Sequence, residues 1–188
     1  TFFGLDGTSV YESEESKLLE RCLSGDREAL LDLFQRHEKR VFNVALGITG
    51  NRADAADVTQ TVFMKAFENL HQFNPKYRFF SWIYRIAVNE SIRNTEHVER
   101  RQPLNGFEES SEHGPEKQAE AQGLSDSVQS SLRGLGAKYR TLVVLKHFQG
   151  FSYREIATIL QLSESVVKSR LYAARQMMKD SLQSRNAI

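Results

Sequence analysis

One stretch decides the fold of this chain: Phe151 to Arg175, with the sequence FSYREIATILQLSESVVKSRLYAAR. Ser152 is followed three residues later by Glu155, which is the spacing of a capping box at the start of a helix. Apolar residues then recur with helical spacing on both sides of a tight turn at 161–163. A small side chain, Ala157, lets the two helices cross closely. The pattern predicts a helix-turn-helix.

The second of these helices turns a polar face away from its apolar side. That face carries hydroxyl and cationic groups at Ser165, Lys168, Ser169, Tyr172 and Arg175. Phosphates and base edges in a DNA major groove both need hydrogen-bond donors. Because the N-terminal part of such a helix carries most base contacts, we expect Lys168 to contact bases and Arg175 to contact phosphate. The alternative is an amphipathic hairpin in a protein core, which needs neither the small residue nor the basic face.

Charge is distributed unevenly along the chain, although the total is nearly balanced at 25 Lys+Arg and 24 Asp+Glu. Residues 124–188 hold 10 basic and 4 acidic residues, whereas residues 99–123 hold 3 and 6. Residues 16–98 hold 12 and 10, and residues 1–15 hold 0 and 4. A basic C-terminal part, an acidic middle and a nearly neutral N-terminal part indicate regions with different roles.

The sequence lacks the signals that identify several functional classes of protein. No apolar run approaches the roughly 18 residues of a membrane span, and no secretory signal is visible, so we expect a cytoplasmic protein. Cys22 stands alone among apolar neighbours, and the five histidines have no metal-ligand spacing. A glycine-rich phosphate loop and a nucleophile elbow are both missing from the sequence. We therefore expect no catalytic residues, no metal, no cofactor and no small-molecule substrate.

The remaining pattern is helical throughout, which predicts an all-α protein of two small helical domains joined by a flexible linker. Asp26 is expected to cap a helix that starts at Arg27, and Ser81 to cap another that runs to about Val98. The linker holds two of the three prolines and little apolar surface. The expected parts are a mobile N-terminal segment at 1–15, a helical domain at 16–98, the acidic linker at 99–123 and a second helical domain, containing the helix-turn-helix, at 124–188.

A strongly amphipathic helix is predicted from Ala53 to Leu70, with Phe67 on its apolar stripe. Its opposite face carries Asp57, Gln60, Thr61 and Met64. Such a face is either an ordinary solvated surface or a docking site for a partner, and spacing alone does not decide between them.

Aromatic and cationic side chains are concentrated in the loop and helix that follow. The concentrated residues are Tyr77, Phe79, Phe80, Trp82, Arg85, Asn89 and Arg93. Aromatic faces stack on unpaired bases, and arginine and amide groups donate hydrogen bonds to base edges. The alternative is a small aromatic core, and Phe80 and Trp82 fit that role equally well. The cluster therefore predicts either single-strand recognition or core packing.

Two segments resemble one protein family. The segment DAADVTQTVFMKAFENLHQF, followed by FFSWIYRIAVNESIR, is similar to region 2 of an extracytoplasmic-function (ECF, group 4) bacterial RNA polymerase sigma factor. FSYREIATILQLSESVVKSRLYAARQMM resembles region 4 of the same family. The order of the segments, the acidic linker and the length match as well, so the resemblance covers about 16–182.

The resemblance implies a non-enzymatic transcription factor whose partners are core RNA polymerase and promoter DNA. The helix with Asp57, Gln60 and Thr61 is similar to the one that docks on the polymerase clamp helices. The segment 73–93 resembles the part that captures the non-template strand of the −10 element, and region 4 contacts the −35 element as duplex. Members of the family are commonly inhibited by an anti-sigma factor, often a membrane-bound one.

Three other functions remain as alternatives: a stand-alone helix-turn-helix regulator with an N-terminal sensor domain, a nucleic-acid-modifying enzyme, and a protein-interaction module. The enzyme would need a carboxylate cluster or a metal motif, which the sequence lacks. A flexible linker of about 25 residues allows a wide spread of distances between the two domains. We therefore expect their separation to be fixed only on the polymerase, and the isolated chain to bind promoter duplex poorly.

Overall fold

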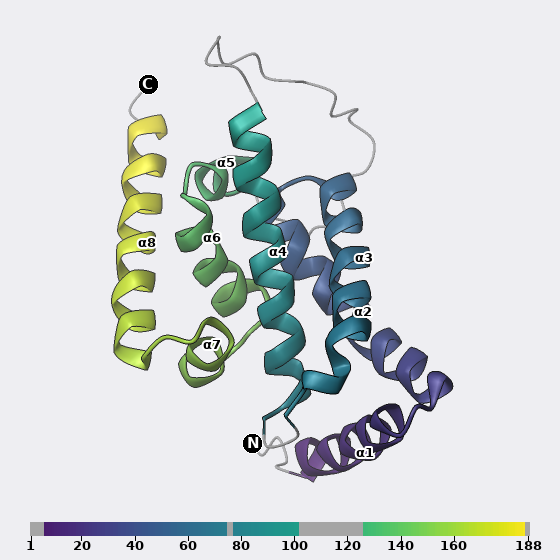
Figure 1. Ribbon diagram of the computed structural model, residues 1–188. Coiled ribbons are helices and arrows are strands. Elements are labelled where there is room, and N and C mark those ends of the chain that lie inside the picture. The colour runs from purple at the N-terminus through teal and green to yellow at the C-terminus, as the bar shows by residue number, and fades with distance from the viewer. Residues whose placement is uncertain (1–5, 75–76, 102–125, 187–188) are drawn as a thin grey trace.

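The structure is a computed structural model that describes residues 6–74, 77–101 and 126–186 (Figure 1). Helices make up all the regular structure of these ranges, which confirms the all-α prediction. The N-terminal unit consists of α1 (Asp6–Leu23), α2 (Arg27–Thr49), α3 (Arg52–Asn69) with a 3₁₀ turn at Leu70–Gln72, and α4 (Phe79–Arg101). The C-terminal unit consists of α5 (Asp126–Arg133), α6 (Ala137–Val143) with a π-helical turn at Val144–Phe148, α7 (Tyr153–Leu160) and α8 (Glu164–Asn186).

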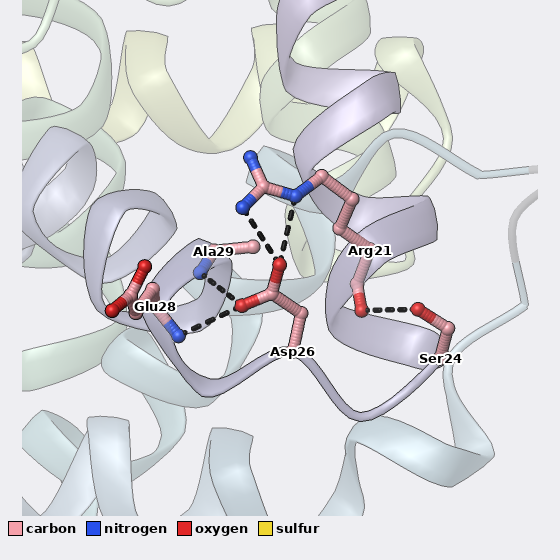
Figure 2. A network of polar contacts seen from close by, with 5 residues as sticks. All are labelled: Arg21, Ser24, Asp26, Glu28 and Ala29. Atoms are coloured by element: carbon pink, nitrogen blue, oxygen red, sulfur yellow. Dashed lines mark hydrogen bonds and ion pairs between the residues drawn. The ribbon is translucent and has the colours of Figure 1, made fainter.

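The corner between α1 and α2 is fixed by Asp26, as predicted (Figure 2). Its carboxylate accepts hydrogen bonds from the backbone N–H of Glu28 at 3.0 Å and of Ala29 at 3.1 Å. Arg21 Nε donates to the same carboxylate at 2.8 Å. The Ala29 N–H and then the Arg21 guanidinium hold the pKa of Asp26 below its usual range. One side chain thus caps α2 and joins it to the end of α1.

Three predicted boundaries are wrong. α1 begins at Asp6, so the segment predicted to be mobile is helical from that residue on; tertiary packing of its later part, through buried Leu18 and Leu19, stabilises a helix that lacks a clear apolar period. α4 begins at Phe79, and Ser81 N–H bonds to Arg78 O at 3.1 Å, so Ser81 lies inside the first turn and does not cap it.

The third concerns the linker, whose first three residues, 99–101, still belong to α4. The rest of the predicted linker falls at 102–123, outside the described residues.

The two units pack on each other through one continuous cluster of buried side chains that extends from Leu18 in α1 to Ala174 in α8. Figure 1 shows α6 and α7 lying between α4 and α8, and α6 also contacts α2. The sequence predicted separate domains because each has its own helical pattern. α6 packs on α8, α2 and α4, and the π-helical turn contacts α2. No local periodicity specifies the contacts with α2 and α4.

Candidate nucleic-acid and protein interfaces

The helix-turn-helix forms as predicted from α7, a short turn and α8. Ser152 Oγ accepts the N–H of Glu155 at 3.2 Å, and the Glu155 carboxylate accepts the N–H of Ser152 at 2.8 Å, which completes the capping box. Gln161 takes the left-handed conformation at φ 54° and its N–H bonds to Ala157 O. Ser163 Oγ accepts the N–H of Val166 at 3.4 Å at the start of α8.

The outer face of α8 is exposed at all five positions that were predicted to contact the −35 duplex. The five are Ser165, Lys168, Ser169, Tyr172 and Arg175. Val167 and Leu171, on the opposite side, are fully buried. The structure therefore brings these five residues onto one solvent-facing helix surface.

The sequence interpretation did not predict that two lysines near this surface contact the same aromatic ring. Lys168 Nζ lies 5.6 Å from the ring centroid of Tyr153, and Lys146 Nζ lies 4.7 Å from the same centroid. Lys146 also donates to Phe151 O at 3.2 Å. Cation–π contacts of this kind restrict a lysine without neutralising it. The ring of Tyr153 thus lies close to two cations of adjacent elements, Lys146 in the π-helical turn and Lys168 in α8.

His147 supports the C-terminal end of the same surface. Arg175 Nη2 and His147 Nε2 are 3.3 Å apart. Partial burial, followed by the positive charges of Arg175 and Lys146, lowers the pKa of His147. A neutral imidazole accepts a hydrogen bond from the guanidinium and places it at the edge of the helix face.

The seven predicted −10 residues do not form one site but fall into separate groups. Three of them, Trp82, Asn89 and Arg93, line a surface hollow of about 330 Å³ between α3 and α4, here called the α3–α4 hollow. Glu90 organises its wall, because its carboxylate lies 2.7 Å from Lys65 Nζ and 3.3 Å from Arg93 Nη1. The hollow combines an aromatic side, an exposed amide and two cations, which are the groups that recognise an extruded base.

Phe79 was predicted to contact single-stranded DNA, but the structure places it in the core. Its side chain is only 2 % exposed and packs against Phe73 at 5.8 Å and Trp82 at 5.6 Å between ring centroids. A ring with these neighbours has no free face for a base, so Phe79 belongs to the aromatic core. The same packing holds Trp82 in place at the hollow.

Two more of the seven, Phe80 and Arg85, contact the C-terminal unit. Phe80 stacks on Phe151 with an interplanar angle of 13° and a centroid distance of 6.1 Å. Arg85 donates to Thr158 O at 2.8 Å and to Ile159 O at 3.1 Å. Tyr77, the last of the seven, is 65 % exposed in the loop before α4.

The predicted docking face of α3 is largely open to solvent. Asp57, Gln60 and Met64 are exposed, whereas Thr61 is half-buried and its hydroxyl donates to Asp57 O at 2.9 Å. Phe67, which was predicted to be buried, is 57 % exposed and lies one turn beyond Met64. Its placement three residues after Met64 is the signal that could have assigned it to the outer face.

An exposed aliphatic side chain on α2, Leu31, adds to the apolar surface of this unit at 60 % exposure. The described residues contain no group of three or more His, Cys, Asp or Glu side chains that could hold a metal ion. Within the same ranges, no helix combines the length and the apolar character that crossing a membrane requires.

Comparison with known families matches both halves of the chain. The family described as Sigma-70 region 2 matches residues 33–102, and the family described as Sigma-70, region 4 matches residues 125–178. The RNA polymerase sigma-H factor of Pseudomonas aeruginosa is 27 % identical over 184 residues, covering 92 % of this chain and 95 % of that protein. The ECF RNA polymerase sigma-E factor of Escherichia coli K12 is 29 % identical over 178 residues, covering 88 % of this chain and 93 % of the relative.

Two solved structures share the fold. CnrH, solved in complex with the cytosolic domain of CnrY, has a TM-score of 0.68 at 24 % identity and covers 90 % of this chain and 97 % of that one. The sigma factor RpoE of Bartonella quintana, solved with the anti-sigma factor NepR, has a TM-score of 0.63 at 24 % identity and covers 81 % and 97 %. With both sigma regions matched in order, and with relatives named ECF sigma factors aligned over most of its length, the chain belongs to the extracytoplasmic-function sigma factors.

Proposed function

We propose that this chain, a group 4 sigma factor without catalytic activity of its own, gives core RNA polymerase its promoter specificity through three surfaces. The exposed face of α3 docks on the polymerase, the α3–α4 hollow receives an unpaired base of the −10 element, and the outer face of α8 contacts the −35 duplex. The observation that carries the proposal is that one chain has two chemically different surfaces: the exposed hydroxyl and cationic face of α8, and the α3–α4 hollow with its aromatic, amide and cationic lining. A stand-alone duplex-binding regulator needs α8 but not the hollow.

The docking surface is proposed to comprise Asp57, Gln60, Met64 and Phe67. Two polar groups beside two exposed apolar side chains resemble the composition of protein interfaces that form and dissociate. Phe67 adds apolar contact area, and the polar groups of Asp57 and Gln60 fix the orientation of the bound polymerase. Thr61 contributes less, because its hydroxyl is already bonded to the helix backbone.

In-vitro transcription with core RNA polymerase tests the proposal. The chain is combined with core polymerase and a library of promoter fragments, and run-off products are sequenced. We expect initiation at a distinct set of fragments that core polymerase alone does not use. The Asp57→Ala/Gln60→Ala double variant should lose core binding in a titration, whereas Glu96→Ala/Glu99→Ala, which removes exposed groups on α4, should not. Sequence-specific duplex binding without any polymerase-dependent transcript would instead identify a stand-alone regulator.

An inhibitory protein partner is the second part of the proposal. Its support is the family membership, together with a fold neighbour that was solved with an anti-sigma factor. We propose that the chain acts in the cytoplasm and that a membrane-bound anti-sigma factor holds it inactive there. A purified candidate inhibitor should abolish run-off transcription, and deletion of residues 101–123 should reduce its effect. A deletion variant that is inhibited as strongly as the full chain would contradict this model.

A further inference from the structure

Glu90 lines the α3–α4 hollow as an ion-paired carboxylate whose side chain is only 12 % exposed. Lys65 Nζ of α3 lies 2.7 Å from it and Arg93 Nη1 of α4 lies 3.3 Å from it, and both contacts are to one oxygen, Oε1. Among the residues that the structure describes, none forms a hydrogen bond with the second oxygen, Oε2. Glu90 is therefore held in place by two cations while one of its acceptor atoms remains available to a group bound in the hollow.

The two cations also make a carboxylate compatible with DNA at this place. Lys65 and Arg93 carry two positive charges against the single negative charge of Glu90, so the three groups together still attract phosphate. A carboxylate without such partners would repel the DNA backbone. The ion pairs thus allow an acceptor-only group to line a surface that binds an anionic polymer.

The amide side chains of the hollow complete its hydrogen-bonding pattern. Asn69 Nδ2 donates to Lys65 O at 2.8 Å, which leaves its carbonyl oxygen as the group that it offers a ligand. Asn89 directly precedes Glu90 on α4 and is exposed, and within the described ranges its amide has no hydrogen-bond partner. Asn89 can therefore supply an N–H donor next to the acceptor of Glu90.

A donor beside an acceptor matches the edges of only some bases. Cytosine and adenine present an amino donor next to a ring-nitrogen acceptor on the Watson–Crick edge, which an unpaired base exposes. Thymine places a carbonyl oxygen where cytosine has its amino group. A carboxylate accepts a hydrogen bond from the amino group and repels the carbonyl oxygen. Cytosine and thymine differ little in shape, so the volume of the hollow, about 330 Å³, does not separate them.

We infer that Glu90 is a specificity-determining residue of the hollow. Its Oε2 accepts a hydrogen bond from the exocyclic amino group of the unpaired −10 base, and the Asn89 amide donates to the neighbouring ring nitrogen. The hollow therefore takes cytosine or adenine in preference to thymine. This inference rests on the proposed function, which places an unpaired base in the hollow and leaves its identity open. A Glu90 that only held Lys65 and Arg93 in place would affect all bases alike.

The first experiment is run-off transcription with core RNA polymerase from a promoter whose −10 element has been randomised. At one −10 position, we expect the wild type to favour cytosine or adenine over thymine by about tenfold or more, as for a hydrogen bond to a charged group. Glu90→Gln should lose the preference at that position alone, because its amide can turn an N–H toward the thymine oxygen. Glu96→Gln, an exposed change on the same helix, is the matched control and should keep the preference.

The second experiment removes the amino group from the base instead of the carboxylate from the protein. A non-template-strand oligonucleotide is bound to the polymerase complex with the preferred base or with an analogue that lacks only the amino group, which is purine for adenine and the corresponding pyrimidinone for cytosine. We expect the analogue to weaken binding of the wild type by about tenfold and to have little effect on Glu90→Gln. The comparison within the wild type does not depend on the stability of any variant.

The outcomes separate this inference from the proposed function. Equal affinity of the wild type for the base and its analogue would overturn the role of Glu90 and leave the proposed function intact. So would a wild type that favours neither cytosine nor adenine at any −10 position, or a Glu90→Gln variant that weakens transcription equally for all bases. A wild-type chain that directs no promoter-specific transcription would instead count against the proposed function.

Discussion

The two surfaces proposed to bind nucleic acid differ in how their residues are arranged. On α8, five predicted residues lie on one exposed helix face. On α4 and the loop before it, seven predicted residues are divided between an exposed loop, an aromatic core, a surface hollow and a contact with α7. The difference has a simple cause. A duplex-contacting face needs only helical periodicity, whereas a pocket for a single base needs walls from several elements.

The largest expected effect separates core from ligand within the α4 group. Phe79→Ala should lower the free energy of unfolding by about 3–5 kcal/mol, because it removes a buried aromatic ring. Tyr77→Ala, at an exposed position two residues earlier, should change it by less than about 0.5 kcal/mol. Urea unfolding followed by circular dichroism measures both. Similar stability of the two variants would return Phe79 to the candidate DNA-contacting residues.

The next effect concerns the α3–α4 hollow itself. Asn89→Ala should weaken open-complex formation by about 0.5–1.5 kcal/mol, because the edge of the unpaired base loses a hydrogen-bond partner in the hollow. Stability and core binding should stay unchanged, since Asn89 is exposed. Permanganate footprinting of the melted promoter region gives the readout. Arg100→Ala, on the same helix but outside the hollow, is the control, and equal footprints for Asn89→Ala and Arg100→Ala would remove the hollow from the −10 site.

Local pattern was sufficient wherever one helix and its caps determine the structure. The Ser152–Glu155 capping box, the Asp26 cap and the outer face of α8 were all predicted from spacing. The failures are tertiary. Phe67 was predicted to be buried and is exposed, whereas Phe79 was predicted to contact DNA and is buried. The burial of an aromatic residue near a helix end depends on which neighbouring helix covers it.

The contact between the units also lay beyond the sequence pattern. The sequence around Arg85 does not distinguish a phosphate contact from a bond to helix carbonyls, because a guanidinium donates to both kinds of acceptor. Gly47 is a mid-helix glycine, for which pattern alone suggests only a weaker helix. In the structure it faces Val144 of the other unit, and a Cβ added at Gly47 would lie 2.8 Å from Val144 Cγ1.

A smaller effect separates base contacts from phosphate contacts on α8. Lys168→Ala should change the preferred −35 sequence, because Lys168 lies near the N-terminal end of the helix. Arg175→Ala should weaken binding equally for all sequences and reduce the salt slope by about one. A promoter-library selection with polymerase measures both, with Lys138→Ala, exposed on α6, as the control. Identical −35 preferences for wild type and Lys168→Ala would contradict this division of roles.

The smallest expected effect is a pH dependence of the free energy of unfolding, which arises beside the α8 surface and not at the α3–α4 hollow. Partial burial, with Arg175 and Lys146 nearby, lowers the pKa of His147 in the folded chain. The unfolded chain therefore binds more protons than the folded chain just below the ordinary histidine pKa of about 6.5. It follows that the free energy of unfolding decreases as the pH falls through that value. Protonation also ends the bond from Arg175 to His147 Nε2, so Arg175 loses the partner that positions it at the edge of the helix face. Thermal unfolding at a series of pH values should show this dependence in the wild type and in His97→Gln, an exposed control on α4, but less of it in His147→Gln. The same pH dependence in all three proteins would mean that titration of His147 does not contribute to the pH dependence of stability.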